Sequence, residues 1–258
     1  MDNTAGEHVI VSRLVAGDDG RSRFENAFLP YDQALGPLRQ STTIVASLIC
    51  FRAWPGDHTG TLGSKSAASV ILVLEGSAKV ESGRGESRRF TQGDVLEIAA
   101  NETSDIGVCS ADGLPFRGAE IFFSTAPSKI PDGASRPKSE QGLPFVRNVT
   151  GDDNRSHFHD GTLPYFTEGD GSLVTEYIAI SRFQYVYAAS DLRYDFHNAP
   201  QRQIVLPLTG GTQGENSDGS RRVIPPGGVY FGEDTTGEGH ITSAVNDAIR
   251  FSVFAHLV

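Results

Sequence analysis

The sequence predicts an all-β protein made of two similar units, and three observations carry this prediction. Apolar runs are short and are separated by frequent glycine (29) and proline (13), a pattern typical of many short strands joined by turns. Helical periodicity is weak along all 258 residues. A sequence pattern also recurs at a fixed offset of 134 residues. Together these observations favour two β-barrels or jelly rolls in tandem.

The repeat is clearest at the start of each half. Residues 15–26 read VAGDDGRSRFEN and residues 149–160 read VTGDDNRSHFHD. The same offset, without gaps, aligns the apolar run 70–76 with 204–210. A single offset over about 90 residues indicates a tandem duplication. We therefore expect two units packed about a pseudo-twofold axis, as in an isologous dimer.

The duplication sets the expected domain boundaries. An N-terminal barrel is expected over residues 1–124, a linker rich in Pro, Ser, Gly and charge over 125–141, and a C-terminal barrel over 142–258. The expected strands are 42–53, 69–75, 77–82, 87–91, 95–99, 105–109 and 116–123 in the first half, and 174–189, 201–208, 220–224, 228–232, 240–245 and 248–256 in the second.

Charge and composition narrow the class of protein. The net charge of −10 would repel nucleic acid on average, so no nucleic-acid partner is expected. No apolar run approaches the roughly 20 residues of a membrane span, and no secretory signal is visible, so we expect a cytoplasmic protein with no membrane partner. Cys50 and Cys109 are too few for a disulfide scaffold, and Cys50 lies in an apolar run that predicts burial. The sequence leaves a monomer and a homodimer both open.

One part of the second half carries the candidate chemistry. Residues 195–210 read DFHNAPQRQIVLPLTG, and residues 226–240 read PGGVYFGEDTTGEGH. These stretches resemble the two motifs of the cupin superfamily, G-x5-H-x-H-x3-4-E-x6-G and G-x5-P-x-G-x2-H-x3-N. The resemblance places His197 on the first histidine, Ala199 on the second and Gln203 on the glutamate. It places His240 on the histidine of the second motif, at a longer spacing.

The resemblance implies a tandem cupin, or bicupin, with a degenerate metal site. Cupins hold Fe, Mn, Ni, Cu or Zn with three histidines and a carboxylate, and Ala199 and Gln203 replace two of these ligands, which should weaken binding greatly. We therefore expect no metal cofactor. The alternative is Fe, Ni, Cu or Zn bound weakly by His197, Gln203 and His240. In the first half, the positions 134 residues before His197, Gln203 and His240 carry no metal-binding side chain. They are Gly63, Ser69 and Ile106.

Groups suited to acid–base chemistry gather in the second half. Residues two apart on a strand share a face, so Ala199, Gln201, Gln203 and Val205 are expected to point the same way as His197, into the barrel. Imidazole also titrates near neutral pH. The expected catalytic residues are His197, His240, Gln203, His157 and His159, of which the last two would join the site only if their strand crosses the barrel mouth. The alternative for these side chains is structural hydrogen bonding.

Aromatic residues also gather there, since six of the seven tyrosines lie in the second half. Small organic ligands are usually held by aromatic walls with a few polar groups. Packing in the core or between the two units is the alternative. The expected substrate-binding residues are Tyr165, Tyr177, Tyr185, Tyr187, Phe196, Gln201 and Tyr230.

Three functions remain open at this stage. The first is an enzyme acting on a small apolar organic molecule of specialised metabolism, by metal-independent isomerisation, cyclisation or dehydration in the C-terminal barrel. The second is a metal-dependent dioxygenase-type cupin that uses His197 and His240. The third is a non-catalytic bicupin that binds or stores a small ligand. The surviving histidines favour the first.

Overall fold

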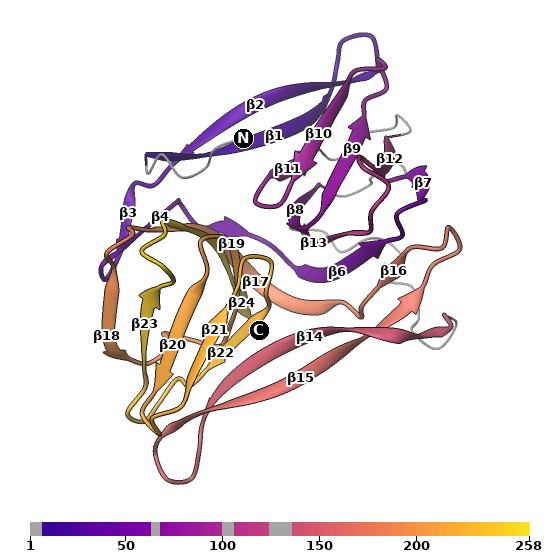
Figure 1. Cartoon of the computed structure of the whole chain (residues 1–258). Helices are drawn as coiled ribbons and strands as arrows, with labels where there is room; N and C mark the ends of the chain where they lie inside the picture. The colour runs from indigo at the N-terminus through magenta and orange to yellow at the C-terminus, as the bar shows by residue number, and fades with distance from the viewer. Residues whose placement is uncertain (1–6, 63–67, 100–105, 124–135) are drawn as a thin grey trace.

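The structure, a computed structural model, describes residues 7–62, 68–99, 106–123 and 136–258 (Figure 1). Within these ranges every regular element is a strand, so the all-β prediction is confirmed. Gly63 and most of the predicted linker lie outside the described residues. Residues 138–141, at the end of that predicted linker, form the start of a long strand, Lys138–Thr150. No helix of the described part has the length and apolar character that a membrane span needs.

The N-terminal half consists of two facing sheets. The larger has the order β2-β1-β11-β8-β13-β6 and the smaller the order β10-β9-β12-β7. All neighbours are antiparallel except β1 and β11. The strands are β1 (His8–Ala16), β2 (Ser22–Pro30), β3 (Gln33–Leu35), β4 (Leu38–Gln40), β5 (Ile44–Val45), β6 (Leu48–Trp54), β7 (Thr59–Thr61), β8 (Ser69–Glu75), β9 (Ser77–Glu81), β10 (Ser87–Thr91), β11 (Val95–Ile98), β12 (Gly107–Ser110) and β13 (Phe116–Phe122).

The C-terminal half repeats this arrangement. Its larger sheet has the order β15-β14-β22-β19-β24-β17, and its smaller sheet the order β18-β23-β20-β21. Here β14 and β22 form the parallel pair. The strands are β14 (Lys138–Thr150), β15 (Ser156–Thr167), β16 (Leu173–Val174), β17 (Ile178–Ala188), β18 (Arg193–His197), β19 (Gln203–Thr209), β20 (Thr212–Asn216), β21 (Arg221–Ile224), β22 (Tyr230–Glu233), β23 (His240–Ala244) and β24 (Arg250–Leu257).

Corresponding strands stand 134 residues apart in the two halves. For example, β8 begins at Ser69 and β19 at Gln203, and β13 begins at Phe116 and β24 at Arg250. The hairpin turns correspond as well, since Asn154 (φ 66°) stands where the first half has Gly20 (φ 73°). Glycine adopts this left-handed backbone without penalty, and asparagine tolerates it better than most residues. The hairpins β1–β2 and β14–β15, which were not among the expected strands, run along opposite sides of the molecule (Figure 1).

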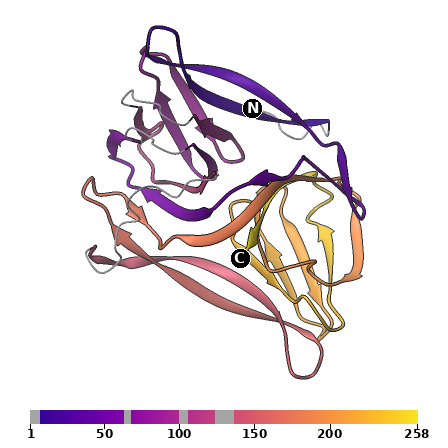
Figure 2. The same cartoon turned by 180° about the vertical axis from the view of Figure 1, so that it is seen from behind.

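The two halves exchange short edge strands. Strand β4 of the first half pairs with β17 of the second, through Gln40 and Val186. Strand β16 of the second half pairs with β6 of the first, through Val174 and Arg52. Figure 2 shows β6 and β17 running side by side where the halves meet. The pairing is reciprocal, as a pseudo-twofold arrangement requires.

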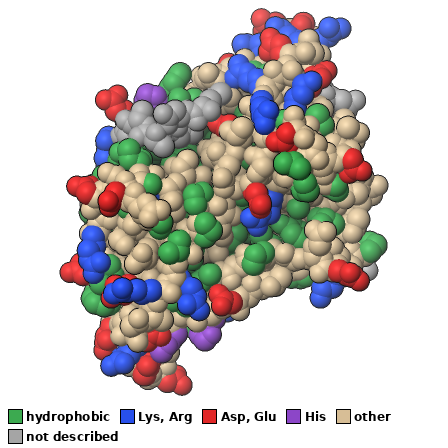
Figure 3. Space-filling view, in the orientation of Figure 1, with side chains coloured by type: hydrophobic (Ala, Val, Ile, Leu, Met, Phe, Trp, Pro, Cys, Tyr) green, Lys and Arg blue, Asp and Glu red, His purple; other side chains and the backbone are tan. Residues whose placement is uncertain are grey.

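The main apolar core lies between the halves. It joins β1, β8 and β13 of the first half to β17, β19 and β24 of the second, with Phe51, Phe183 and Phe251 among its fully buried side chains. A second core fills the interior of the N-terminal barrel. Outside, acidic and basic side chains are interspersed over the face shown in Figure 3. The shared core buries apolar surface of the two halves against each other, which holds them together.

Candidate active site in the C-terminal barrel

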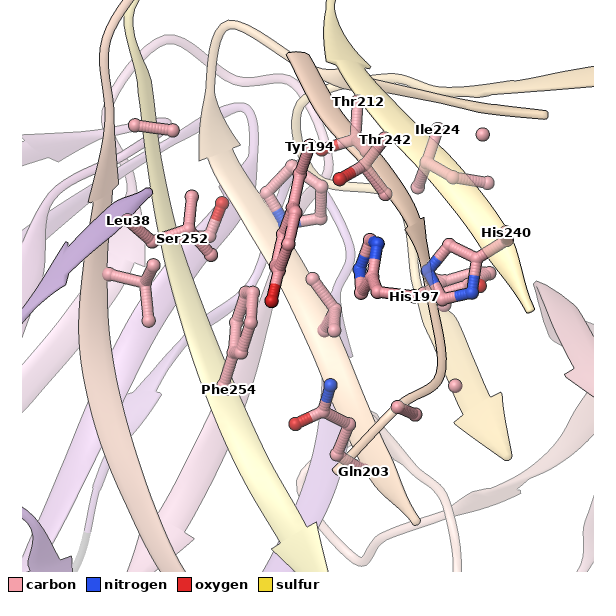
Figure 4. A pocket seen from close by; sticks show the side chains of 18 of the residues that line it. Leu38, Tyr194, His197, Gln203, Thr212, Ile224, His240, Thr242, Ser252 and Phe254 are labelled. Atoms are coloured by element: carbon pink, nitrogen blue, oxygen red, sulfur yellow. The ribbon is translucent and has the colours of Figure 1, made fainter. Parts of the chain in front are cut away.

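A cavity of about 140 Å³ lies between the two sheets of the C-terminal barrel. Its lining comes from every strand from β17 to β24, and Figure 4 shows the side chains from close by. Leu35 and Leu38, carried on β3 and β4, complete one wall from the N-terminal half. The lining comprises Leu35, Leu38, Phe158, Val186, Ala188, Tyr194, His197, Asn198, Ala199, Pro200, Gln203, Val205, Pro207, Thr212, Gly214, Ile224, Tyr230, Gly232, His240, Thr242, Arg250, Ser252 and Phe254.

The two histidines expected from the sequence meet in this cavity. His197 ends β18, His240 begins β23, and the two residues face each other in the strand pairing. Their ring centroids are 4.4 Å apart (Figure 4). Gly239 precedes His240 with φ 75°, and a Cβ there would lie 2.4 Å from the carbonyl oxygen of His197. Only glycine permits this close approach, which explains the Gly-His sequence at this point.

His240 belongs to a buried hydrogen-bond chain. Its Nδ1 lies 2.5 Å from Oδ2 of Asp234, and the Oγ of Ser156 donates to the same oxygen at 2.9 Å. Asp234 is fully buried and His240 is 5% exposed. Because a carboxylate accepts hydrogen bonds, Nδ1–H of His240 is the donor to Asp234, and Nε2 is the ring nitrogen outside this bond. Sequence reasoning did not select Asp234, because the cupin motifs have no acidic residue at that place.

His197 stands in a different environment. Its Nδ1 donates to the backbone carbonyl of Asp195 at 2.7 Å, and its ring stacks on Tyr194 with centroids 3.7 Å apart. Burial, with a contribution from the nearby His240, lowers the pKa of His197 to about 4. His197 is therefore neutral at pH 7, and its Nε2 can accept a hydrogen bond from a ligand.

Two further polar residues serve the cavity. Gln203 is 7% exposed, and its Oε1 has no hydrogen-bond partner among the described residues. Figure 4 shows its amide pointing into the cavity below the histidines. Burial, reinforced by the Asp234 carboxylate, raises the pKa of Tyr230, so this phenol stays protonated. Both side chains can hydrogen-bond a ligand, because buried polar groups normally have partners.

The donor atoms in the cavity do not fit the metal site of a cupin. Two imidazoles and the Gln203 amide are present, and Ala199 lines the cavity where the resemblance implies the second histidine. The carboxylate of Asp234 is directed to Nδ1 of His240. Among the described residues no group of three or more His, Cys, Asp and Glu side chains is placed to hold an ion. Without an anionic ligand the set is poor for a divalent cation.

The H-x-H pair lies away from the cavity. On β15 the side chain that lines the cavity is Phe158, so its neighbours His157 and His159 lie on the other face of the strand. His157 bonds Asp218 at 3.0 Å and Asp153 at 2.9 Å, and the Asp153 contact raises its pKa. His159 is exposed. The structure thus does not join these residues to His197 and His240.

Of the expected substrate-binding residues, the structure brings Tyr230 to the cavity. Tyr165 and Tyr185 are buried in the core between the halves, where Tyr187 also packs, and Tyr177 packs against Phe122. These four do not line the cavity.

The remaining two, Phe196 and Gln201, also lie elsewhere. Phe196 is 53% exposed, and Oε1 of Gln201 accepts a hydrogen bond from Arg182 at 2.6 Å. Residues 198–202 connect β18 to β19 and are not part of a strand. The expected inward alternation therefore fails at Gln201, although Ala199 still lines the cavity. Gln203 and Val205 lie beyond the turn and face inward as expected.

The lining includes residues that sequence reasoning missed. Arg250, Ser252 and Phe254 alternate on β24 and face the cavity. The sequence did contain a pattern for them, since a strand was expected at 248–256 and residues two apart on a strand share a face. Leu35 and Leu38 gave no signal, because the strand exchange that brings them here is a tertiary event.

Comparison with known proteins finds likeness in structure alone. No family description and no curated protein matches the sequence. Solved structures that are similar include a cupin 2 conserved barrel domain protein from Leptotrichia buccalis, with TM-score 0.45, 13% identity and coverage of 86% of this chain and 88% of that one. AerE from Microcystis aeruginosa has TM-score 0.38 and 12% identity, and the likeness covers 98% of this chain and 100% of that one.

A variant of oxalate decarboxylase from Bacillus subtilis is also similar, with TM-score 0.33, 11% identity and coverage of 86% of this chain and 74% of that one. All three TM-scores are below 0.5, so the fold is argued from the strand pairing of this chain. The observed pair of two-sheet barrels agrees with the fold that the motifs implied. The two facing sheets of each half are the arrangement expected of two jelly rolls in tandem.

Proposed function

We propose that the C-terminal barrel is the active site of an enzyme that moves a proton on a small, largely apolar organic molecule. The observation that carries the proposal is the buried Ser156–Asp234–His240 chain, which ends at an apolar cavity. A carboxylate that orients an imidazole also stabilises the imidazolium formed when Nε2 takes a proton. His240 is thus the residue that carries the proton.

An isomerisation needs no further reagent. Nε2 of His240 takes a proton from a carbon next to a carbonyl group or double bond, the electron pair shifts along the conjugated system, and the imidazolium returns the proton to another atom of the same molecule. His197, neutral because of its low pKa, accepts a hydrogen bond from a donor group on the substrate. Gln203 and Tyr230 supply donors that stabilise negative charge as it develops on a substrate oxygen.

Hydrogen–deuterium exchange tests this proposal before the natural substrate is identified. The protein is incubated in D2O with a panel of small cyclic ketones and enones, and deuterium incorporation at carbon is followed by NMR. We expect exchange above the buffer rate with at least one compound, and a fall of about 10²-fold or more in His240→Gln. Asp234→Asn, which keeps the shape but not the charge, should lose about tenfold or more.

His159→Gln is the matched control, because this histidine is exposed on the outer face of β15. It should exchange like the unsubstituted protein. Equal exchange by the unsubstituted protein and His240→Gln would remove the catalytic role of His240. Ligand binding without exchange would instead favour a non-catalytic binding protein.

A further inference from the structure

Arg250 is an unusual residue for the interior of a β-barrel. It begins β24, is 5% exposed, and lines the cavity together with Ser252 and Phe254 of the same strand. Its counterpart 134 residues earlier is Phe116, a core residue of the N-terminal barrel. Arginine is almost never buried without a partner, because removing the guanidinium from water is costly.

Only one nitrogen of Arg250 has hydrogen-bond partners. Nη1 donates to Oγ1 of Thr212 and to the carbonyl oxygen of Ser243, each at 3.3 Å. Nε and Nη2 are buried and have no partner among the described residues. Burial lowers the pKa of Arg250 to about 10, which still leaves the side chain charged at neutral pH. The wall of the cavity therefore holds a buried cation with one edge unsatisfied among the described residues.

The unsatisfied atoms identify the complementary group. Nε and Nη2 are the two donors on one edge of the guanidinium, and a carboxylate accepts from such an edge through two parallel hydrogen bonds. The rest of the lining is mostly apolar, with side chains such as Val186, Phe254 and Leu38. An inorganic anion would leave this apolar wall without a partner, whereas an organic acid would use both features.

We propose that Arg250 binds the carboxylate of the ligand, so that the cavity takes small monocarboxylic acids with an apolar body. The inference rests on the proposed function for the place of the reaction. Ser243, whose carbonyl accepts from Arg250, stands three positions after His240 on β23. At a rise of about 3.3 Å per residue this is about 10 Å, so the acid group and the reacting carbon lie at opposite ends of the ligand.

Calorimetric titration of the full chain at pH 7 tests the inference with pairs of ligands that differ only in charge. The probes are cyclohexylacetate, phenylacetate and 3-phenylpropanoate, each beside its neutral amide. We expect at least one acid to bind about 10- to 100-fold more tightly than its amide, the difference expected of a charge-assisted hydrogen-bonded pair. In Arg250→Met this preference should fall to less than about threefold.

Two controls make the result specific. Arg250→Lys keeps the charge but not the two-donor edge, so it should retain only part of the preference. Thermal unfolding shows whether Arg250→Met still folds, and its Tm should equal or exceed that of the unsubstituted protein, because an unpaired buried charge is removed. His240→Gln should keep the preference for acids. Loss of exchange with this preference intact therefore separates the catalytic role from the binding role.

Several outcomes would overturn the proposal. One is that no acid of the panel binds the unsubstituted protein more tightly than its amide. Another is that Arg250→Met keeps the preference. Titrations with chloride, phosphate and acetate form the last arm: if these anions bind as tightly as the larger acids, the site is one for inorganic or minimal anions and the apolar body plays no part.

Discussion

The two barrels share their strand positions but differ in what fills them. In the N-terminal barrel Trp54 and Phe116 stack with ring centroids 4.6 Å apart. At the same places in the C-terminal barrel, 134 residues later, stand Ala188 and Arg250, which line the cavity. The void in the N-terminal interior is about 20 Å³, against about 140 Å³ in the C-terminal one. The cavity thus follows from side-chain size on a repeated scaffold.

Smaller replacements act in the same direction. Val80, Ile98 and Ile106 belong to the core of the N-terminal barrel, and at the corresponding positions Gly214, Gly232 and His240 line the cavity. Polar groups differ as well. Ser69 donates to Glu120 at 3.0 Å, whereas its counterpart Gln203 has an unpartnered Oε1. The N-terminal barrel is filled by packed side chains, whereas the C-terminal barrel has less packing and encloses a cavity.

The largest effect should come from removing a large side chain from the packed core of the N-terminal barrel. Trp54→Ala removes a residue that is 4% exposed and stacked on Phe116, so we expect a loss of about 3–5 kcal/mol in the free energy of unfolding. Urea unfolding followed by circular dichroism measures it. If Trp54→Ala unfolds no more easily than the unsubstituted protein, the N-terminal barrel is not the packed half.

A larger side chain in the cavity of the C-terminal barrel should act mainly on ligand affinity. A Cβ at Gly232 would meet its nearest neighbour, Cε1 of Tyr230, at 3.4 Å, which is an ordinary contact. Gly232→Ala therefore fits without a clash, and Gly232→Ile, which copies Ile98 of the other half, should extend into the cavity and weaken ligand binding by about tenfold or more. Calorimetry with the acid probes measures the binding, and thermal unfolding provides the control. Unchanged affinity would place the ligand outside the cavity.

The pH dependence of stability should differ between the inner and outer histidines. The pKa of His197 is lowered to about 4, so its contribution is complete above pH 6.5, its ordinary value, and is lost as the pH falls toward 4. Between pH 7 and 5 we expect His197→Gln to lose about 1 kcal/mol less stability than the unsubstituted protein, after allowance for partial screening by solvent. Chemical denaturation at the two pH values measures this difference.

The contribution of His157 to stability should change with pH in the opposite direction. Hydrogen bonding to Asp153 raises its pKa, so its contribution is present below pH 6.5 and is lost as the pH rises through the raised value. His157→Gln should therefore lose less stability than the unsubstituted protein when the pH is raised from 6 to 8. If His157→Gln and His197→Gln respond to pH in the same direction, the assignment of these two environments is wrong.

The smallest effect is expected from metal removal. Because the donor set is two imidazoles and an amide, protein purified without a histidine tag should hold less than about 0.1 metal ion per chain, and soaking with Fe, Ni, Cu or Zn should not raise this value. Elemental analysis measures the content, and exchange activity should survive dialysis against a chelator. Near-stoichiometric metal that restores activity would favour the dioxygenase-type alternative.

Much of the fold could be predicted because it depends on local sequence patterns. Short apolar runs between Gly and Pro predicted strands, and β19 was expected at 201–208 and observed as Gln203–Thr209. The hairpins β1–β2 and β14–β15 were missed as strands, although the repeat was recognised in them. Their sequences mix polar and apolar residues, and it is pairing with a neighbouring strand that makes them extended.

Prediction of the site was less complete. His197, Gln203, His240 and Tyr230 all reach the cavity, since motif spacing constrains positions along neighbouring strands. The other expected tyrosines do not reach it, because aromatic content alone does not distinguish a pocket wall from a core. Asp234 and Arg250 were missed, because their importance depends on which atoms face them.

The strand class, the repeat and the half that retains histidines could be read from residue order, because periodicity and an internal offset are properties of the chain. Three relations depend on how the chain folds: Asp234 orients His240, Arg250 is left with unsatisfied donors, and Leu35 and Leu38 close the cavity from the other half. These relations join residues far apart in sequence, and their energies depend on burial and distance, which residue types do not specify.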